Sequence, residues 1–180
     1  MQRRTLLQVA AGVASLGQFG LDTASAAIVK SAATGAVGDF EFLSGNWKIK
    51  HRQWKNKQWD VFDGEATVFG MLGGAASVEE LRIPARNFSG MGLRLLDIER
   101  KLWADYWVNG KRGVLNPPSW GSFTNGVGIW DAEDVDDGKP VITRGAWDQI
   151  APDSCRWVQA VSRNNGKTWE ENWLMNWLRV

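Results

Sequence analysis

The sequence has little of the chemistry that metals, nucleotides or disulfides need. It contains one cysteine and one histidine in 180 residues. A lone cysteine cannot form an intramolecular disulfide, and one His with one Cys cannot build a zinc site of the usual kind. Neither a phosphate-binding glycine loop nor a dinucleotide fingerprint is present, so we expect no cofactor and no metal. Cys155 lies in phase with Trp157 and is predicted to be a small core residue, not a nucleophile.

Beyond its first residues, the chain also lacks an apolar run long enough to span a membrane. Residues 1–26 contain the pair Arg3-Arg4, then an apolar stretch broken by glycines, then the small-x-small sequence Ala24-Ser25-Ala26. This pattern resembles the twin-arginine export signal of bacteria, which implies a periplasmic or secreted protein. An ordinary signal peptide or a helical anchor remains open as the alternative.

A charge excess is missing too. We predict a signal at 1–26, a linker at 27–38 and a single domain at 39–180. The whole sequence has 21 basic and 20 acidic residues, and the signal holds two Arg and one Asp, which leaves 19 of each in the rest. A net charge near zero argues against nucleic acid or anionic lipid as the main partner. An oligomer is possible, but the sequence does not indicate one.

Strand-like sequence, in contrast, fills the domain. Residues 45–53 alternate cleanly, with basic side chains on one face and Trp47, Ile49 and His51 on the other. Further strands are predicted at 58–69, 74–83, 91–98, 102–109, 121–131, 139–148, 154–162 and 168–178, separated by segments with turn residues. About nine short, evenly spaced strands predict an all-β fold, an antiparallel meander that closes into a β-barrel and so avoids exposed edges. A sandwich is the alternative.

The last two predicted strands form a hairpin around Asn164-Asn165-Gly166. Alternation puts Trp169, Glu171, Trp173 and their in-phase neighbours on one face of the final strand. This face is mostly aromatic, so we predict that it points inward and that Glu171 is buried in it.

Twelve tryptophans are many for one small domain. A buried indole N–H needs a hydrogen-bond partner, so some of these rings are predicted to line a cavity, cover a barrel end or lie on the surface. The alternative is that they simply fill a wide interior. Residues 110–120 form the longest connection and are predicted to be either a lid, with Trp120 over the barrel mouth, or a stiff spacer around Pro117-Pro118.

Two short features resemble the lipocalin/calycin pattern: Gly45-x-Trp47 on the first strand, after a short helical turn, and Arg179 near the end of the last strand. The resemblance implies that Trp47 plugs the closed end of a barrel and that Arg179 packs across its ring in a cation–π contact.

The rest of the domain is similar to a Trp-rich, lipocalin-like family of bacterial exported proteins of unknown function. The segments that carry this likeness are Phe42-Leu43-x-Gly45-x-Trp47, Trp103-x-x-Tyr106-Trp107, Gly121-x-Phe123-x-x-Gly126-x-Gly128, Trp157-x-Gln159-Ala160-x-Ser162 and Thr168-Trp169-Glu170-x-Asn172-Trp173-x-Met175. The likeness implies a small-molecule pocket inside a barrel and no established reaction. Haem-binding nitrobindin-like barrels are a more distant likeness, and they need a late His that this chain lacks.

Seven residues are predicted to bind a ligand because they are polar or aromatic within otherwise apolar strands: Glu79, Arg94, Trp107, Arg144, Trp147, Gln159 and Trp173. A charge kept inside must be paired, so Arg94 or Arg144 is expected to meet Glu79 or Glu171. For each of these charged residues taken alone, the alternative is a position on the outer face in an ordinary surface ion pair. Glu171 is the exception, because its face of the strand is mostly aromatic.

His51 and Glu171 are the candidates for catalysis. They are predicted to meet across the seam of the barrel, because the first and last strands of a closed meander are neighbours. Such a pair titrates near neutral pH and can move protons, with Tyr106 as an acid or oxyanion donor. A hydrogen-bonded, structural His51 is the alternative.

The sequence therefore predicts an exported protein that binds a hydrophobic or aromatic small molecule inside a Trp-lined barrel. A cofactor-independent lyase or isomerase acting on such a ligand is the second possibility. An envelope protein that interacts through exposed tryptophans is the third.

Overall fold

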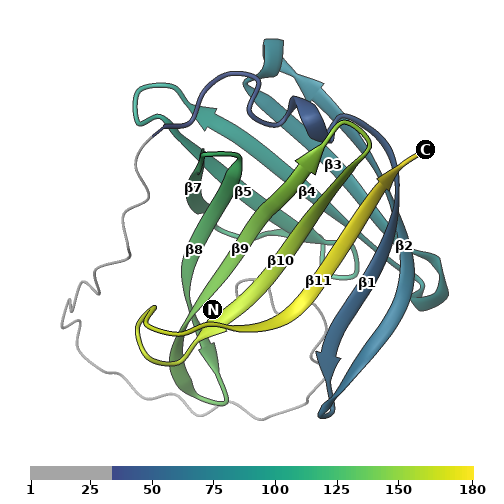
Figure 1. The fold of residues 1–180 in the computed structure, drawn as a ribbon, viewed down its shortest axis with the longest axis vertical. Helices are drawn as coiled ribbons and strands as arrows, with labels where there is room; N and C mark the ends of the chain where they lie inside the picture. Colours follow the sequence, from purple (N-terminus) through teal and green to yellow (C-terminus); the bar gives the residue numbers. More distant parts are fainter. Residues whose placement is uncertain (1–33) are drawn as a thin grey trace.

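The chain folds as a closed antiparallel β-barrel, as the strand spacing predicted (Figure 1). This computed structural model describes residues 34–180. The strands are β1 (Gly45–Lys55), β2 (Gln58–Met71), β3 (Ala76–Ile83), β4 (Phe88–Asp97), β5 (Leu102–Asn109), β6 (Val114–Leu115), β7 (Ser119–Thr124), β8 (Val127–Asp136), β9 (Lys139–Ala151), β10 (Ser154–Ser162) and β11 (Glu170–Arg179). Three short 3₁₀ helices accompany them: η1 (Glu41–Leu43), η2 (Leu72–Gly74) and η3 (Pro84–Arg86). No helix among these residues is long and apolar enough to cross a membrane.

Ten strands make the barrel wall; the two-residue β6 pairs only with Val108 and Asn109 at the end of β5. Neighbouring strands of the wall pair antiparallel; β4 pairs with β5, and β7 pairs with the first half of β5, beside the stretch that β6 contacts. The seam that closes the barrel joins β1 to β11, where Trp47 lies opposite Arg179 and Gln53 opposite Trp173. The first and last strands are therefore neighbours, as predicted.

The strand count differs from the prediction at one place. The segment 121–131 was expected to be one strand, but it contains a tight turn between β7 and β8. Asn125 and Gly126 form this turn with φ angles of 52° and 76°. An Asn-Gly pair favours such left-handed turn conformations, and it splits the predicted strand into two barrel strands.

One end of the barrel is closed by η1 and its flanking residues. The indole nitrogen of Trp47 donates a hydrogen bond to the Leu43 carbonyl at 2.8 Å. The Arg179 guanidinium lies 4.2 Å from the centre of the Trp47 ring and donates to the carbonyls of Ser44 and Phe42 at 2.6 and 2.7 Å. The contact between the early Trp and the late Arg is therefore confirmed.

Tryptophans fill much of the interior. Eight of the twelve are buried, and their rings meet mostly edge to face; for example, Trp147 and Trp177 have centroids 5.3 Å apart. Trp54 and Trp120 are the exposed ones. The aromatic side chains thus form a packed core over most of the barrel length, and any ligand site has to lie within or beside this core.

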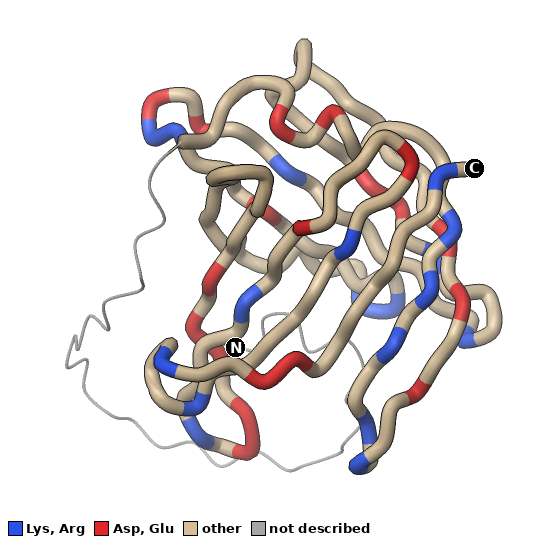
Figure 2. Tube along the Cα trace, viewed as in Figure 1, with Lys and Arg blue, Asp and Glu red and all other residues tan. Residues whose placement is uncertain are grey.

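The outer wall carries mixed charge. Lys and Arg follow β1, while Asp and Glu lie on the adjacent β2 (Figure 2). Lys50 and Asp63 face each other across these two strands at 2.5 Å. Exposed pairs of this kind contribute little to stability. The part of the predicted linker that the structure describes is held against the barrel, because the Gly35 N–H donates to the Lys101 carbonyl at 2.8 Å.

Candidate ligand site inside the barrel

Three charged side chains meet inside the barrel. Glu79, Arg94 and Asp105 come from the adjacent strands β3, β4 and β5, and all three are buried. Arg94 Nη2 lies 2.5 Å from Glu79 Oε2, and Arg94 Nε lies 3.9 Å from Asp105 Oδ1. The predicted pairing of Arg94 with Glu79 is therefore present. Burial alone would lower the pKa of the Arg94 guanidinium, but the charges of Glu79 and then Asp105 outweigh it and raise that pKa above its usual value.

Several hydrogen-bond donors around this charged group have no acceptor among the described residues. They are Nε and Nη1 of Arg94 and the indole nitrogens of Trp107, Trp147 and Trp177. All four residues line one cavity of about 30 Å³, together with Glu79 and Asp105. Buried polar groups normally have partners, so this cavity is chemically incomplete on the protein side alone.

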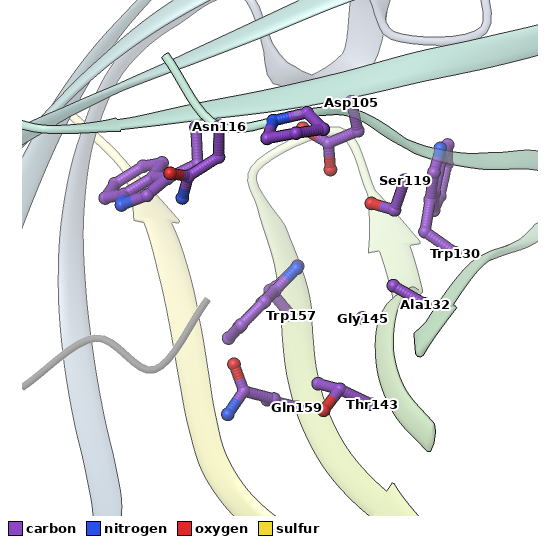
Figure 3. Close-up of a pocket in the computed structure, with 11 residues that line it drawn as sticks. Asp105, Asn116, Ser119, Trp130, Ala132, Thr143, Gly145, Trp157 and Gln159 are labelled. Carbon is purple, nitrogen blue, oxygen red and sulfur yellow. The ribbon is translucent and has the colours of Figure 1, made fainter. Parts of the chain in front are cut away.

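A second cavity of about 20 Å³ is shown in Figure 3, and it shares lining residues with the first one. Asp105, Trp107 and Trp157 line both cavities. The second cavity is more polar, because the side chains of Asn116, Ser119, Thr143 and Gln159 also face it. Three positions of the 110–120 segment therefore border this cavity: Asn116, Pro117 and Ser119.

The two cavities are small. A space of about 10–15 Å³ holds one water molecule, and sites for drug-sized ligands are usually about 300–1,000 Å³. The predicted cavity is therefore present but small, because the aromatic side chains occupy the room. Each of the two spaces holds one or two water-sized groups, and a larger ligand requires side chains that line them to move.

A glycine makes room for one of the lining rings. Gly90 on β4 lies beneath the six-membered ring of Trp107, and a Cβ atom at this position would collide with that ring. Any larger residue at position 90 would push Trp107 towards the cavities, so this glycine sets the position of a cavity wall.

Five of the predicted ligand residues line the two cavities: Glu79, Arg94, Trp107, Trp147 and Gln159. Trp173 is buried but contacts neither cavity; its indole nitrogen donates to Nδ1 of His51 at 3.2 Å. Arg144 lies outside, which corrects the prediction for this residue. It holds Asp131 with two hydrogen bonds of 2.7 and 2.8 Å, and its guanidinium stacks 3.9 Å from the Trp169 ring.

The predicted catalytic trio does not assemble. Glu171 is exposed, because β11 has a bulge: Gln159 pairs with Trp173, but the next residue, Ala160, pairs with Glu171. Asn172 is the extra residue of this bulge. The residues before Trp173 therefore point to the opposite face from the one that strict alternation predicts, so Glu171 points outward. Tyr106 lies on the outer face, since its neighbours Asp105 and Trp107 point inward. Only His51 of the three is inside.

His51 is a structural residue at the seam. Its ring is fully buried and stacks on Phe62 with centroids 4.6 Å apart, and it accepts the Trp173 hydrogen bond. The imidazole lies against Gly64, where a Cβ atom would collide with it. Burial, and secondarily the charge of Arg86, lower the pKa of His51 to about 3. The imidazole is therefore neutral at physiological pH and is no general base of the predicted kind.

This neutral histidine makes folding depend on pH. The unfolded chain binds a proton at His51 below its ordinary pKa of 6.5, whereas the folded protein does so only near 3. Stability is therefore fully present above pH 6.5 and falls as the pH drops towards 3. Between pH 7 and pH 5 we expect a loss of about 2 kcal/mol in the free energy of unfolding.

Urea unfolding at both pH values, on the parent and on His51→Gln, measures this loss. The variant has no titrating ring, so its difference between pH 7 and pH 5 should be smaller by about 2 kcal/mol. In the folded parent, the ring resonances of this single histidine should not titrate between pH 8 and pH 5. A midpoint near 6.5 would contradict the burial described here.

Sequence reasoning missed several cavity residues, among them Asp105 and Trp157. Asp105 carried a usable signal, because it lies in phase between Trp103 and Trp107 on one strand, the pattern that singled out Glu171. Asn116 and Ser119 carried none, since polar residues in connections and at strand ends are usually solvated. Cys155 is buried, which confirms the predicted core position, and burial raises the pKa of its thiol to about 12.

Comparisons with known proteins show the fold only. No family model matches the chain, and neither does any curated protein. Among solved structures, the chain is similar to Rv2717c from M. tuberculosis, with a TM-score of 0.50 and 12% identity over 79% of this chain and 97% of that one. A protein of unknown function of the DUF3598 family from Nostoc punctiforme also matches, with a TM-score of 0.45 and 12% identity, over 84% of this chain and 53% of that one.

Proposed function

We propose that this protein binds a small molecule with an aromatic or hydrophobic body inside its barrel. The observation that carries the proposal is the group of buried donors without protein acceptors beside two joined cavities in a tryptophan wall. Trp107 and Trp157 line both cavities and offer flat apolar faces for stacking. The polar side chains around them can fix the orientation of a ligand.

Kinship with the lipocalin/calycin barrels is part of the same proposal. The Trp47–Arg179 contact at the end closed by η1 supports it. Export to the periplasm or beyond is a further part, and it rests on the sequence of residues 1–26, which lie outside the described residues. Cell fractionation tests the export, and recovery of the unprocessed chain from the cytoplasm would contradict it.

The acid–base alternative is not proposed, because the pair on which it rests lies on two sides of the wall. His51 is buried and neutral at physiological pH, and Glu171 is exposed beside Arg156, whose pKa its charge helps to raise. Binding is therefore the function that the geometry supports best.

The size of the cavities gives the test of this proposal. Trp157→Ala removes one of the two rings that border both cavities, so it should admit compounds that the parent binds weakly, such as indole and toluene. We expect the affinity of the variant for these probes to rise by at least about tenfold, because the enlarged cavity offers apolar contacts without rearrangement. Saturable changes in tryptophan fluorescence, checked by calorimetry, measure it.

Trp120→Ala is the matched control, since Trp120 is exposed and stacks with Arg100 outside the barrel. It should leave the affinities unchanged. The proposal fails if neither the parent nor Trp157→Ala binds any compound of an aromatic and lipid-like panel. Native mass spectrometry of protein purified from its own host would weigh a retained ligand directly.

A further inference from the structure

The barrel interior already holds more negative than positive charge. Arg94 is the basic residue among those that line the cavities, and it faces the carboxylates of Glu79 and Asp105. Building on the proposed function, we propose that the ligand presents an uncharged hydrogen-bond acceptor, such as a ketone, amide carbonyl or ether oxygen, to this group. A lone buried arginine would suggest a ligand with a carboxylate. Because Arg94 already faces two carboxylates, we expect a ligand with a neutral head group.

The donors set the first requirement. Nε and Nη1 of Arg94 and the indole nitrogens of Trp107, Trp147 and Trp177 can only donate hydrogen bonds. A carbonyl or ether oxygen in the cavity has two lone pairs and can accept from more than one donor. A ligand that brings only donors, such as an alkylammonium, leaves all of them unsatisfied and places its charge beside the Arg94 guanidinium. The donor set therefore favours an acceptor head group over a cationic one, although Gln159 Oε1 on the wall of the second cavity is an acceptor without a donor among the described residues.

The charges set the second requirement. Glu79 holds Arg94 at 2.5 Å, and Asp105 lies 3.9 Å from it on another side. With all three ionised, the group carries a net charge of −1. A ligand carboxylate would add a second uncompensated negative charge to a buried site, and burying an unpaired charge is far more costly than burying a neutral polar group.

Three probes of similar shape separate these head groups: acetophenone with a neutral carbonyl, benzoate with a carboxylate, and ethylbenzene with no acceptor. Against the ¹⁵N-labelled protein we expect acetophenone to bind at least about tenfold more tightly than either of the others, the factor that one well-made hydrogen bond supplies. The indole N–H resonances of Trp107, Trp147 and Trp177 should move downfield.

Other indoles serve as internal controls. Trp47 already donates to the Leu43 carbonyl and Trp130 to the Trp103 carbonyl, so acetophenone should leave their N–H resonances in place. Shifts confined to these two, or to the exposed Trp54, would place the probe elsewhere and overturn the inference.

Removing one carboxylate should change the preference. Glu79→Gln keeps an amide oxygen that can accept the Arg94 hydrogen bond but leaves the group electrically neutral, so benzoate should bind at least about tenfold more tightly than to the parent. Asp105→Asn should act in the same direction and serves as the second variant if Glu79→Gln folds poorly. Glu80→Gln is the matched control, because Glu80 pairs with Arg82 outside the barrel at 2.8 Å and should change nothing.

The outcomes separate the two proposals. If acetophenone and ethylbenzene bind equally and no interior indole shifts, the neutral-acceptor site is wrong while an apolar binding function survives. If the parent prefers benzoate, or both carboxylate variants leave the preference as it was, the charge argument is wrong. If no probe binds to the parent, to the carboxylate variants or to Trp157→Ala, both the inference and the proposed binding function fail.

Discussion

Replacement of Trp47 by alanine is expected to lower the free energy of unfolding by about 3–5 kcal/mol, the range for large aromatic residues in packed cores. Trp47 is fully buried, and its ring meets the Trp177 ring edge to face at 5.9 Å. The substitution also leaves the Leu43 carbonyl without its 2.8 Å hydrogen bond and removes the surface on which Arg179 lies. Three separate contacts at the closed end are lost together.

Urea unfolding followed by far-UV circular dichroism measures this loss. Trp54→Ala is the control, because Trp54 is half-exposed at the tip of the β1–β2 hairpin and contacts mainly Trp59, at 5.5 Å. It should cost less than about 1 kcal/mol. An equal loss in the free energy of unfolding for the two variants would contradict the placement of Trp47 in a packed barrel end.

The closed barrel was predictable because its signals are local. Strict alternation in residues 45–53 put Trp47, Ile49 and His51 inward, and all three are buried. The contact of Trp47 with Arg179 followed from a family resemblance that covers both ends of the chain. The turn at Asn125-Gly126 was visible in the sequence but was passed over within a longer predicted strand.

The candidate site was predictable only in part, because each of its groups depends on its neighbours across strands. Glu79 and Arg94 stand out as charges within apolar strands, and they do pair inside. Arg144 has the same appearance in the sequence but points outward to Asp131. The prediction for Glu171 was wrong for another reason. A one-residue bulge moves every residue on one side of it to the opposite face of the strand, and no local sequence pattern predicts that bulge.

The volume of the interior lay beyond sequence reasoning altogether. Composition gives the number of tryptophans, but the number of strands and the positions of glycines such as Gly90 decide how closely the rings approach. The result is a barrel whose interior is mostly side chain, with its buried Glu79, Arg94 and Asp105 on the adjacent strands β3, β4 and β5. The stability of the protein and the binding that we propose therefore depend on the same charged residues.

Replacement of Arg94 by methionine is expected to destabilise the protein by about 3–5 kcal/mol, because it leaves two buried carboxylates without their cation. Glu79 and Asp105 are each about as buried as Arg94 itself, with side chains only 3–5% exposed, so water cannot replace the guanidinium. Methionine keeps most of the apolar volume, which separates the loss of charge from the loss of packing.

The triple variant Arg94→Met, Glu79→Gln, Asp105→Asn decides between these two causes. It removes the cation and both carboxylates while keeping similar shapes, so it should recover part of the loss, since a buried charge pair is often worth little against neutral replacements. Arg163→Met is the control, because Arg163 is half-exposed and pairs with Asp136 at 2.5 Å on the surface; it should cost less than about 1 kcal/mol. A triple variant as unstable as Arg94→Met alone would mean that packing around the guanidinium, and not its charge, holds this level of the barrel together.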